Sequence, residues 1–357
     1  MSKLENKEIV SLYCGIGAIE EAGKNQSIQH DIVAACDYHD HVEKVYKILN
    51  PQAENKYIHD VTTIKKGDIK RGVGLLSHGS PCQDFSINGK EEGGDKGSET
   101  RSSLMHVSVD IIEDVMPEIV VWENVLNSIS SKHVHNVNAY IESLSKLGYI
   151  SSMEVLNSDD YNIPQGRKRV FIVSQLNGEK FVFPEKIKRT VKLKDLCRFR
   201  EKDDITFNFE RYCYENKDTY GLTKCDHVNA SFETKKGDEN IIDFNEFIKN
   251  LKPGRTNVIN MNMYKYDQLN RITIIDDSLK TKSPTLSCRG AQNYTIKYLH
   301  EGKIYKPSPL MCALLMGFSE ETFNKIKDSG TDSELIDRFG NSIVVTVWEA
   351  ILKKIYK

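Results

Sequence analysis

A short apolar segment that runs into a glycine turn and then a helix constrains the fold of this chain most strongly. Residues 8–14 form an apolar run of strand length, and the turn Gly15-Ile16-Gly17 follows before a helical pattern begins. Glycines at such a turn let a ligand approach the backbone closely. A second apolar run at 30–36 is followed by an amphipathic helix pattern at 40–50. This alternation predicts an α/β fold.

The glycine turn departs from a dinucleotide site. Such a site would carry a third glycine at position 20, where this chain has Glu20 followed by Glu21. We expect a carboxylate pair at a helix start to repel a pyrophosphate. A nicotinamide or flavin dinucleotide, and with it an oxidoreductase, is therefore disfavoured. An adenosine cofactor with an amino-acid tail and no phosphates is not excluded in this way.

Two carboxylates follow the next strands. Asp37 comes 20 residues after Gly17, where βαβ units place an acid on ribose hydroxyls. Asp60 ends a third short strand and could accept a hydrogen bond from an adenine amino group. The alternative for both is a carboxylate that caps a turn, and for Asp60 taken alone that alternative is the stronger.

The segment Gly79-Ser80-Pro81-Cys82-Gln83 follows an apolar run at 73–78 that predicts a buried strand. A cysteine on a strand-end loop, beside a rigid proline, stands where α/β enzymes place nucleophiles. Taken alone, the segment fits a buried structural thiol equally well. Residues 88–98 hold four glycines and five charges, as expected either for a mobile lid or for an idle surface loop. Another predicted strand, 118–122, ends at Glu123 on the same rim.

The alternation of strands and helices stops at about residue 176 and resumes at 310. Residues 185–300 contain 22 Lys and Arg against 17 Asp and Glu, whereas the rest of the chain contains 27 against 34. A basic insert on an acidic body suits a polyanion held by one part of the molecule, although chance variation in surface charge explains it too. We predict a cofactor-binding and catalytic domain at 1–180, an inserted domain at 181–300, and a returning segment at 301–357.

Composition narrows the remaining classes. The eight cysteines include no CxxC pair, so neither a disulfide framework nor a zinc finger is favoured, and we expect no metal. No apolar run approaches the length of a membrane span, and the N-terminus lacks an apolar signal core. We expect a cytoplasmic protein without a membrane partner.

The order of the motifs resembles the cytosine-C5 DNA methyltransferase family, of the bacterial or phage type, across nearly the whole chain. Each motif is short, but five occur in the family's order, with a variable block between the last two. The motifs are Gly15-Ile16-Gly17, Pro81-Cys82-Gln83, Glu123-Asn124-Val125, the Gln-x-Arg-x-Arg pattern of 165–169, and Gly340-Asn341-Ser342. Two departures occur: Ala18 replaces the family's second consecutive glycine, and 306–310 is a loose version of its basic motif before Gly317-Phe318.

The resemblance implies an S-adenosylmethionine-dependent methyltransferase fold, which is Rossmann-like, with a mainly irregular or β target-recognition domain inserted before the C-terminal helix. It implies methyl transfer to C5 of a cytosine in a specific short sequence of double-stranded DNA, with S-adenosylhomocysteine as product. Because a cytosine in a duplex is out of reach, the base would be flipped out. The family expectation is a monomer, with any cognate restriction endonuclease acting separately.

The chemistry explains the residue types that the resemblance assigns. Cytosine C5 is a poor nucleophile until a thiolate adds to C6, the role of Cys82. Glu123 would hold a proton at N3, and we expect burial against Trp122 to raise its pKa. Arg167 and Arg169 suit the cytosine O2 and the lid. Gln83 and Ser86 complete the implied catalytic set. The implied cofactor residues are Tyr13, Gly15, Ile16, Gly17, Asp37, Tyr38, Asp60, Val61, Pro81, Leu104, Asn341 and Ser342.

Sequence readout would come from the insert, through contacts to base edges. Candidates are Arg255, Asn257, Arg271 and Arg289, although phosphate contact or solvated surface is the alternative for each. Two rival functions stay open: a tRNA cytosine-C5 methyltransferase of the same family, and a catalytically silent nucleic-acid-binding module. Cys82, Glu123 and Arg169 together argue against the silent module.

Overall fold

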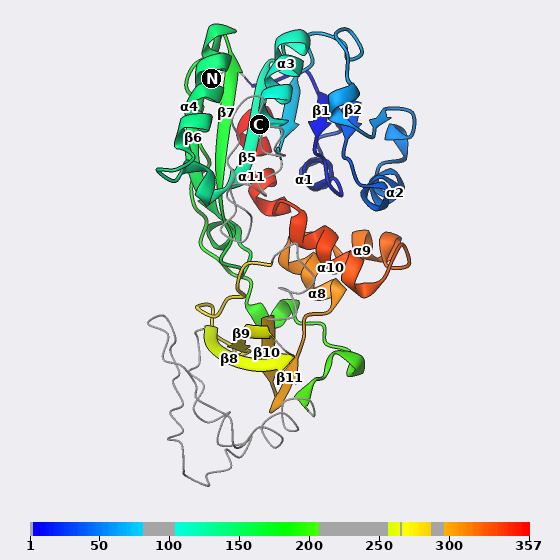
Figure 1. The fold of residues 1–357 in the computed structure, drawn as a ribbon, viewed down its shortest axis with the longest axis vertical. Helices are drawn as coiled ribbons and strands as arrows, with labels where there is room; N and C mark the ends of the chain where they lie inside the picture. Colours follow the sequence, from blue (N-terminus) through cyan, green and yellow to red (C-terminus); the bar gives the residue numbers. More distant parts are fainter. Residues whose placement is uncertain (1–2, 81–103, 207–255, 265, 287–295) are drawn as a thin grey trace. The chain divides into compact units, whose positions relative to one another are not determined.

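The computed structural model describes residues 3–80, 104–206, 256–264, 266–286 and 296–357, and only the backbone of 256–271 within these ranges (Figure 1). The chain divides into two compact units. Unit 1 comprises residues 1–161, 168–187 and 342–357, and unit 2 comprises 162–167 and 188–341. The domain boundaries expected from the sequence stay a prediction.

Unit 1 is built on a seven-stranded sheet with the strand order β3-β2-β1-β4-β5-β7-β6. The first five of these strands in space are parallel, and β7 runs antiparallel to both of its neighbours. The strands are β1 (Glu8–Leu12), β2 (Asp31–Cys36), β3 (Tyr57–Ile58), β4 (Leu75–His78), β5 (Ile119–Val125), β6 (Tyr149–Asn157) and β7 (Lys168–Leu176). This sheet, with the helices that cover it, confirms the predicted α/β fold.

Helices cover both faces of the sheet in unit 1. Val10, Leu76 and Val120 point to one face and pack in one buried cluster with residues of α3 (Leu104–Val115) and α4 (Val134–Lys146). On the other face, α1 (Ala18–Asn25) packs against α11 (Val345–Tyr356). Phe171 of β7 meets Trp348 of α11 edge to face, with ring centroids 6.0 Å apart. The helix α2 (Asp40–Leu49) buries the predicted apolar face, with Val42, Val45, Tyr46 and Leu49 all inside.

The C-terminal helix belongs to the same unit as the first strand. The backbone N–H of Leu4 donates to the carbonyl of Ile355 at 2.9 Å. Asn25 at the end of α1 donates to the Glu349 carboxylate at 2.7 Å. Contacts between residues more than 300 positions apart thus join the two ends of the chain within unit 1.

Unit 2 contains a four-stranded sheet with the order β11-β10-β9-β8. β9 and β10 are parallel, and the other two pairs are antiparallel. Three α-helices of the described part of unit 2 accompany the sheet, and Ser308 and Ser319 cap the first two by accepting from Met311 and Thr322. The elements are β8 (Thr256–Tyr264), β9 (Tyr266–Ile274), β10 (Ile296–His300), β11 (Lys303–Tyr305), α8 (Pro309–Leu315), α9 (Glu320–Ile326) and α10 (Asp332–Asn341).

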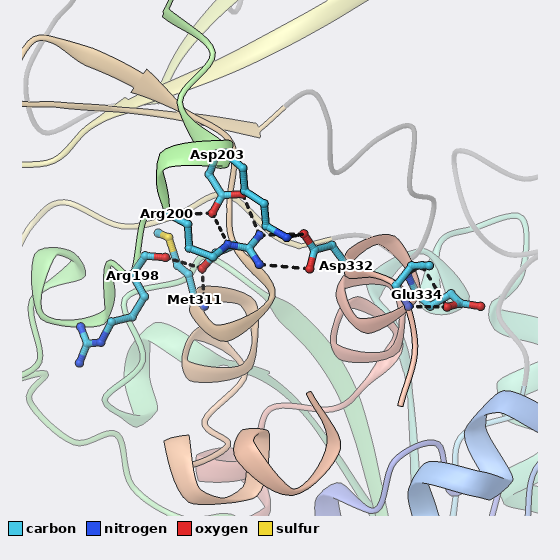
Figure 2. A network of polar contacts seen from close by, with 9 residues as sticks. Arg198, Arg200, Asp203, Met311, Asp332 and Glu334 are labelled. Atoms are coloured by element: carbon cyan, nitrogen blue, oxygen red, sulfur yellow. Dashed lines mark hydrogen bonds and ion pairs between the residues drawn. The ribbon is translucent and has the colours of Figure 1, made fainter. Parts of the chain in front are cut away.

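An arginine ties two distant segments of unit 2 together (Figure 2). The Arg200 guanidinium donates to the fully buried Asp203 at 2.7 and 2.8 Å and to Asp332, at the start of α10, at 2.9 and 3.1 Å. Ser308, the cap of α8, donates to the carbonyl of Arg198. Charge-assisted bonds of this kind are the strong ones. Residues 198–203 are thereby fixed to the start of α8 and of α10.

The part of the chain that the structure describes contains no helix long and apolar enough to cross a membrane.

Candidate active site

The carboxyl ends of four parallel strands meet along one rim of unit 1, in the order β2, β1, β4, β5. The glycine turn follows β1, Asp37 follows β2, and Gly79 and Ser80 follow β4. Glu123 lies two residues before the end of β5. Ligand sites of α/β sheets form at this edge.

The glycine turn is held against β2. Gly15 and Gly17 both have positive φ, 52° and 85°, which favours glycine at these positions. The Gly15 N–H donates to Asp37 Oδ2 at 3.0 Å, and the His39 N–H donates to Oδ1 at 3.3 Å. Burial raises the pKa of Asp37, against the lowering effect of these two bonds. A Cβ on Gly15 would meet no atom of the described residues within 4 Å, so among these residues the space beside the turn is open to a ligand.

Glu20 does not face the ligand side of the turn as we expected. Its carboxyl is buried and accepts from Ser11 of β1 at 2.6 Å and from Tyr46 of α2 at 2.7 Å. Burial raises the pKa of Glu20, which favours the neutral acid. The predicted repulsion of a pyrophosphate by a carboxylate pair is therefore wrong for Glu20. A Cβ on Gly17 would lie 3.2 Å from Glu20 Oε2 and 2.9 Å from Asn50 Nδ2, so this position has no room for a side chain.

Two other predicted cofactor residues are in direct contact. The Tyr13 hydroxyl donates to the carbonyl of Leu104 at 3.0 Å and accepts from Ser108 at 3.3 Å. Burial raises the pKa of the Tyr13 phenol far above its usual range. The start of α3 is thereby held beside the residue that follows β1. Tyr38, in contrast, is exposed, with its ring 5.2 Å from the His59 ring.

The remaining predicted cofactor residues are more dispersed. Asp60 caps the short helix Val61–Thr63 and accepts from the Thr62 N–H at 2.9 Å, which is the alternative that the sequence favoured. Ile16 and Val61 are buried. Asn341 ends α10 in unit 2, and Ser342 begins the returning segment of unit 1.

The start of the predicted nucleophile loop is attached to β5. Ser80 accepts from Trp122 Nε1 at its Oγ, at 3.3 Å, and from Asn124 Nδ2 at its carbonyl, at 3.2 Å. A Cβ on Gly79 would lie 3.5 Å from Glu123 Oε2. The chain thus reaches the Glu123 carboxyl just before the Pro-Cys motif. Four predicted residues of this loop, Pro81, Cys82, Gln83 and Ser86, lie outside the described residues.

Glu123 and Arg169 form an ion pair at this rim. Arg169 Nε lies 3.1 Å from Glu123 Oε1, and the two side chains are 18% and 12% exposed. The pairing of β5 with β7 places Arg169 opposite Val125, two residues from Glu123. We expected Glu123 to be buried against Trp122, but adjacent residues of a strand point to opposite faces of the sheet. The Trp122 ring lies 5.8 Å from the Tyr140 ring, in the buried cluster that contains residues of α3 and α4. The side chain in contact with Glu123 is therefore Arg169 and not Trp122.

A buried histidine that the sequence analysis did not single out precedes this loop. His78, the last residue of β4, shares a 2.8 Å hydrogen bond between Nε2 and the Tyr140 hydroxyl. Burial lowers the pKa of His78 to about 3, so the ring is neutral at physiological pH. Its position directly before Gly79 was the available signal, but the partner on α4 is 62 residues away.

The first two members of the Gln-x-Arg-x-Arg motif bind backbone groups within unit 2. Gln165 donates from Nε2 to the carbonyl of Leu315 at 2.8 Å and accepts from the Leu286 N–H at 3.1 Å. The buried Arg167 donates to the carbonyls of Leu286 at 2.6 Å and Gly340 at 2.9 Å. Because β7 begins at Lys168, Arg167 precedes the strand, and strand alternation does not relate it to Arg169. These contacts support a positioning role for Arg167.

Little is described of the predicted recognition residues. Asn257 lies in β8 and Arg271 in β9, and only their backbone is described. Arg255 and Arg289 lie outside the described residues.

One group of metal-type ligands occurs among the described residues, formed by Asp40, Glu43 and His59. His59 Nδ1 lies 3.5 Å from Asp40 and 3.6 Å from Glu43, and Glu43 also pairs with Lys47 at 2.8 Å. Polar contacts among surface side chains explain this group, and such contacts contribute little each.

Comparison with known proteins shows which proteins this chain resembles. The family model for C-5 cytosine-specific DNA methylases matches residues 7–357. The orphan methyltransferase M.Rho11sI of Bacillus phage rho11s is 32% identical over 214 residues, which are 59% of this chain and 41% of the phage protein. The type II methyltransferase M2.ScrFI of Lactococcus lactis subsp. cremoris is 26% identical, over 100% of this chain and 91% of that protein. The solved methyltransferase EhMeth of Entamoeba histolytica superposes with a TM-score of 0.67 over 99% of this chain and 98% of its own, at 13% identity. That likeness shows the fold alone.

Proposed function

The chain belongs to the C-5 cytosine-specific DNA methylase family, and from this premise we propose that it methylates a cytosine in a specific short sequence of double-stranded DNA through a covalent bond between Cys82 and C6 of the base. Membership of this family establishes that the protein is a DNA cytosine-5 methyltransferase. The residues, the adduct, the flipped base and the specific site are our proposal.

The observation that carries the proposal is the Glu123–Arg169 pair beside the start of the Pro-Cys loop. Glu123 Oε1 lies 3.1 Å from Arg169 Nε, while Gly79, three residues before Cys82, approaches Glu123 Oε2. A carboxyl and a guanidinium held together can contact neighbouring atoms of one pyrimidine, N3 and O2. The neutral His78 and the bonds on Ser80 fix the loop where it leaves β4.

The proposed reaction uses these groups in sequence. The Cys82 thiolate forms a bond to C6 and pushes an electron pair toward C5. Glu123, in its protonated form, donates a proton at N3, which neutralises the charge that the addition develops in the ring. N3 returns this proton to Glu123 when the C6–sulfur bond breaks. Arg169 holds O2 with a charge-assisted hydrogen bond and holds the Glu123 carboxyl in place. After C5 has gained the methyl group, a base removes the C5 proton, the C6–sulfur bond breaks, and Cys82 is released.

The residues of the glycine turn fit S-adenosylmethionine. The open space beside Gly15 admits the ligand, Asp37 has acceptor capacity beyond its two backbone bonds, and the Glu20 carboxyl is bound to Ser11 and Tyr46 inside the protein. When bound, this cofactor supplies the electrophilic methyl group. We assign its ribose to Asp37, and we place Tyr13, Leu104 and Tyr38 around it. Asp60 keeps one carboxylate oxygen without a described partner, which leaves it able to accept from the adenine amino group.

The base must leave the duplex to reach this rim, because C6 and N3 of a stacked cytosine are inaccessible. We assign sequence readout to unit 2, with Asn257 and Arg271 on its sheet as candidates. We expect the enzyme to act as a monomer, separately from any cognate restriction endonuclease, which light scattering of the protein with and without DNA will test.

The experiment that tests the proposal uses purified protein, S-adenosylmethionine and a DNA library that contains every short sequence context. Bisulfite sequencing then identifies protected cytosines. Protection confined to one short motif supports the proposal and gives the target sequence. Protection spread over all contexts contradicts specificity. Absence of protection on DNA, with methylation of tRNA in a parallel reaction, contradicts the choice of substrate.

A further inference from the structure

A lysine in the sheet of unit 2 is buried without an acidic partner among the residues that the structure describes. Lys297 lies in β10 and is 5% exposed. Burial, with a smaller contribution from the positive charge of Lys306, lowers the pKa of Lys297 to about 7. Lysines are almost never buried unless they are paired, so this side chain requires an explanation.

At the positions paired with Lys297, the neighbouring strands carry no acidic residue. On β9 its pairing partner is Ile272. On the other side, β10 pairs with β11 at Tyr298 and Tyr305. This register, extended one residue beyond the end of β11, sets Lys297 opposite Lys306, whose positive charge acts on Lys297. Like charges directly opposite each other in a sheet destabilise it. Among the described residues, neither lysine forms an ion pair.

The acidic side chains nearest in the fold already have cations of their own. Lys306 bonds through its backbone N–H to the carbonyl of Asp203, but the Asp203 carboxylate is turned to Arg200 (Figure 2). Asp204, the next residue, pairs with Lys303 at 3.0 Å. Asp332 pairs with Arg200 and with Lys202, each at 2.9 Å. Within the described part of unit 2, these three carboxylates are thus paired without Lys297 and Lys306.

Two amines that lack a counter-ion among the described residues, one of them largely removed from water, can together bind an anion. An unpaired buried charge costs several kcal/mol in a typical protein, and a compact anion between two ammonium groups would remove most of that cost. A phosphodiester fits, because one phosphate carries several acceptor oxygens and lysine serves as a point charge for phosphate. The sheet that carries the pair also carries Asn257 and Arg271.

We propose that Lys297 and Lys306 form a binding subsite for a backbone phosphate of the DNA substrate. The inference rests on the proposed function, in which unit 2 binds DNA. It adds a contact that orients the sheet of unit 2 on the duplex without reading the sequence. None of the four recognition candidates from the sequence is part of this subsite.

The test measures binding of a short DNA duplex by fluorescence anisotropy over a series of salt concentrations. The variants are Lys297→Met and Lys306→Met, with Lys303→Met as the matched control, because Lys303 belongs to the same sheet and is already paired with Asp204. Each lost phosphate contact lowers the slope of log K against log salt by about 0.9. We expect a reduction of about one for Lys297→Met and Lys306→Met, and an unchanged slope for Lys303→Met.

Folding is controlled by circular dichroism and by Lys297→Arg, which keeps the charge and should keep the wild-type slope. If Lys297→Met does not fold, the partly exposed Lys306 carries the test through its own variant. Equal slopes for all three methionine variants, with normal DNA binding by the wild type, overturn the subsite and leave the proposed function intact. Failure of the wild type to bind DNA overturns both.

Discussion

The ion pair between Arg169 and Glu123 allows a quantitative prediction about catalysis. Its 3.1 Å separation and the low exposure of both side chains leave little solvent to screen it. A hydrogen bond to a charged group in such a setting contributes about 1.5–3 kcal/mol. Since 1.36 kcal/mol corresponds to a tenfold change in rate, losing this contact alone lowers the rate of methyl transfer about 10- to 150-fold.

A double-mutant cycle isolates that contribution. We will compare Arg169→Gln, Glu123→Gln and the double variant with the wild type in single-turnover methylation at saturating DNA and S-adenosylmethionine. Each single variant is expected to lose the coupling in addition to its own contact with the base. The double variant should therefore be faster than the product of the single effects predicts, by a coupling energy of about 1.5–3 kcal/mol.

The chain offers a matched control in the exposed pair of Glu142 and Lys146 on α4, at 2.8 Å. Its cycle, made with Gln at both positions, should leave the rate unchanged, because exposed pairs contribute little. Additive effects at Arg169 and Glu123, within about 0.5 kcal/mol, with folded proteins by circular dichroism, would refute the joint action of the two groups on the ring. A Glu123→Gln rate within about threefold of wild type would place ring activation elsewhere.

Three further predictions concern the nucleophile, the cofactor site and pH. Cys82→Ala should abolish methyl transfer while equilibrium dialysis shows near-normal cofactor binding, and turnover above a few per cent of wild type would contradict its role. Asp37→Ala removes the acceptor of the Gly15 N–H and should raise the KM for S-adenosylmethionine about 10- to 100-fold, with a smaller effect on kcat; an unchanged KM would show that Asp37 does not serve the cofactor. The pKa of Lys297, lowered to about 7, lies below that of an unfolded lysine at about 10.4, so between these values the unfolded chain holds a proton that the folded chain lacks. The free energy of unfolding from this group therefore rises with pH above about 7, by at most about 1.4 kcal/mol per pH unit. Urea titrations at pH 7.5 and 9.0 should show this rise relative to Lys297→Met, and an equal pH response in both proteins would contradict it.

The local features of the fold could be predicted from the sequence. The glycine turn after β1, the amphipathic helix α2 and the strand that ends at Glu123 follow from periodicity over short windows. The place of β7 between β5 and β6 could not, because it depends on pairing between strands that are distant in the chain. The periodicity of apolar residues also does not predict which edge of the sheet β6 and β7 occupy.

The site was predictable where a motif determines position and unpredictable where a distant contact determines chemistry. Glu20 was expected to face a ligand, but Tyr46, 26 residues away, draws its carboxyl into the protein. Arg167 binds the carbonyls of Leu286 and Gly340, which are 119 and 173 residues away. The partner of Glu123 was partly foreseeable, because strand alternation already separates it from Trp122.

The most direct test of the central claim is a covalent trap. DNA that carries 5-fluorocytosine presents no proton at C5, so the final elimination is blocked after methyl transfer and the enzyme stays bound to C6. Incubation of such DNA with the protein and S-adenosylmethionine should give a complex that survives denaturing electrophoresis and is absent for Cys82→Ala. A wild-type enzyme that methylates ordinary DNA but forms no such complex, or a complex that persists in Cys82→Ala, would contradict the proposed Cys82 adduct.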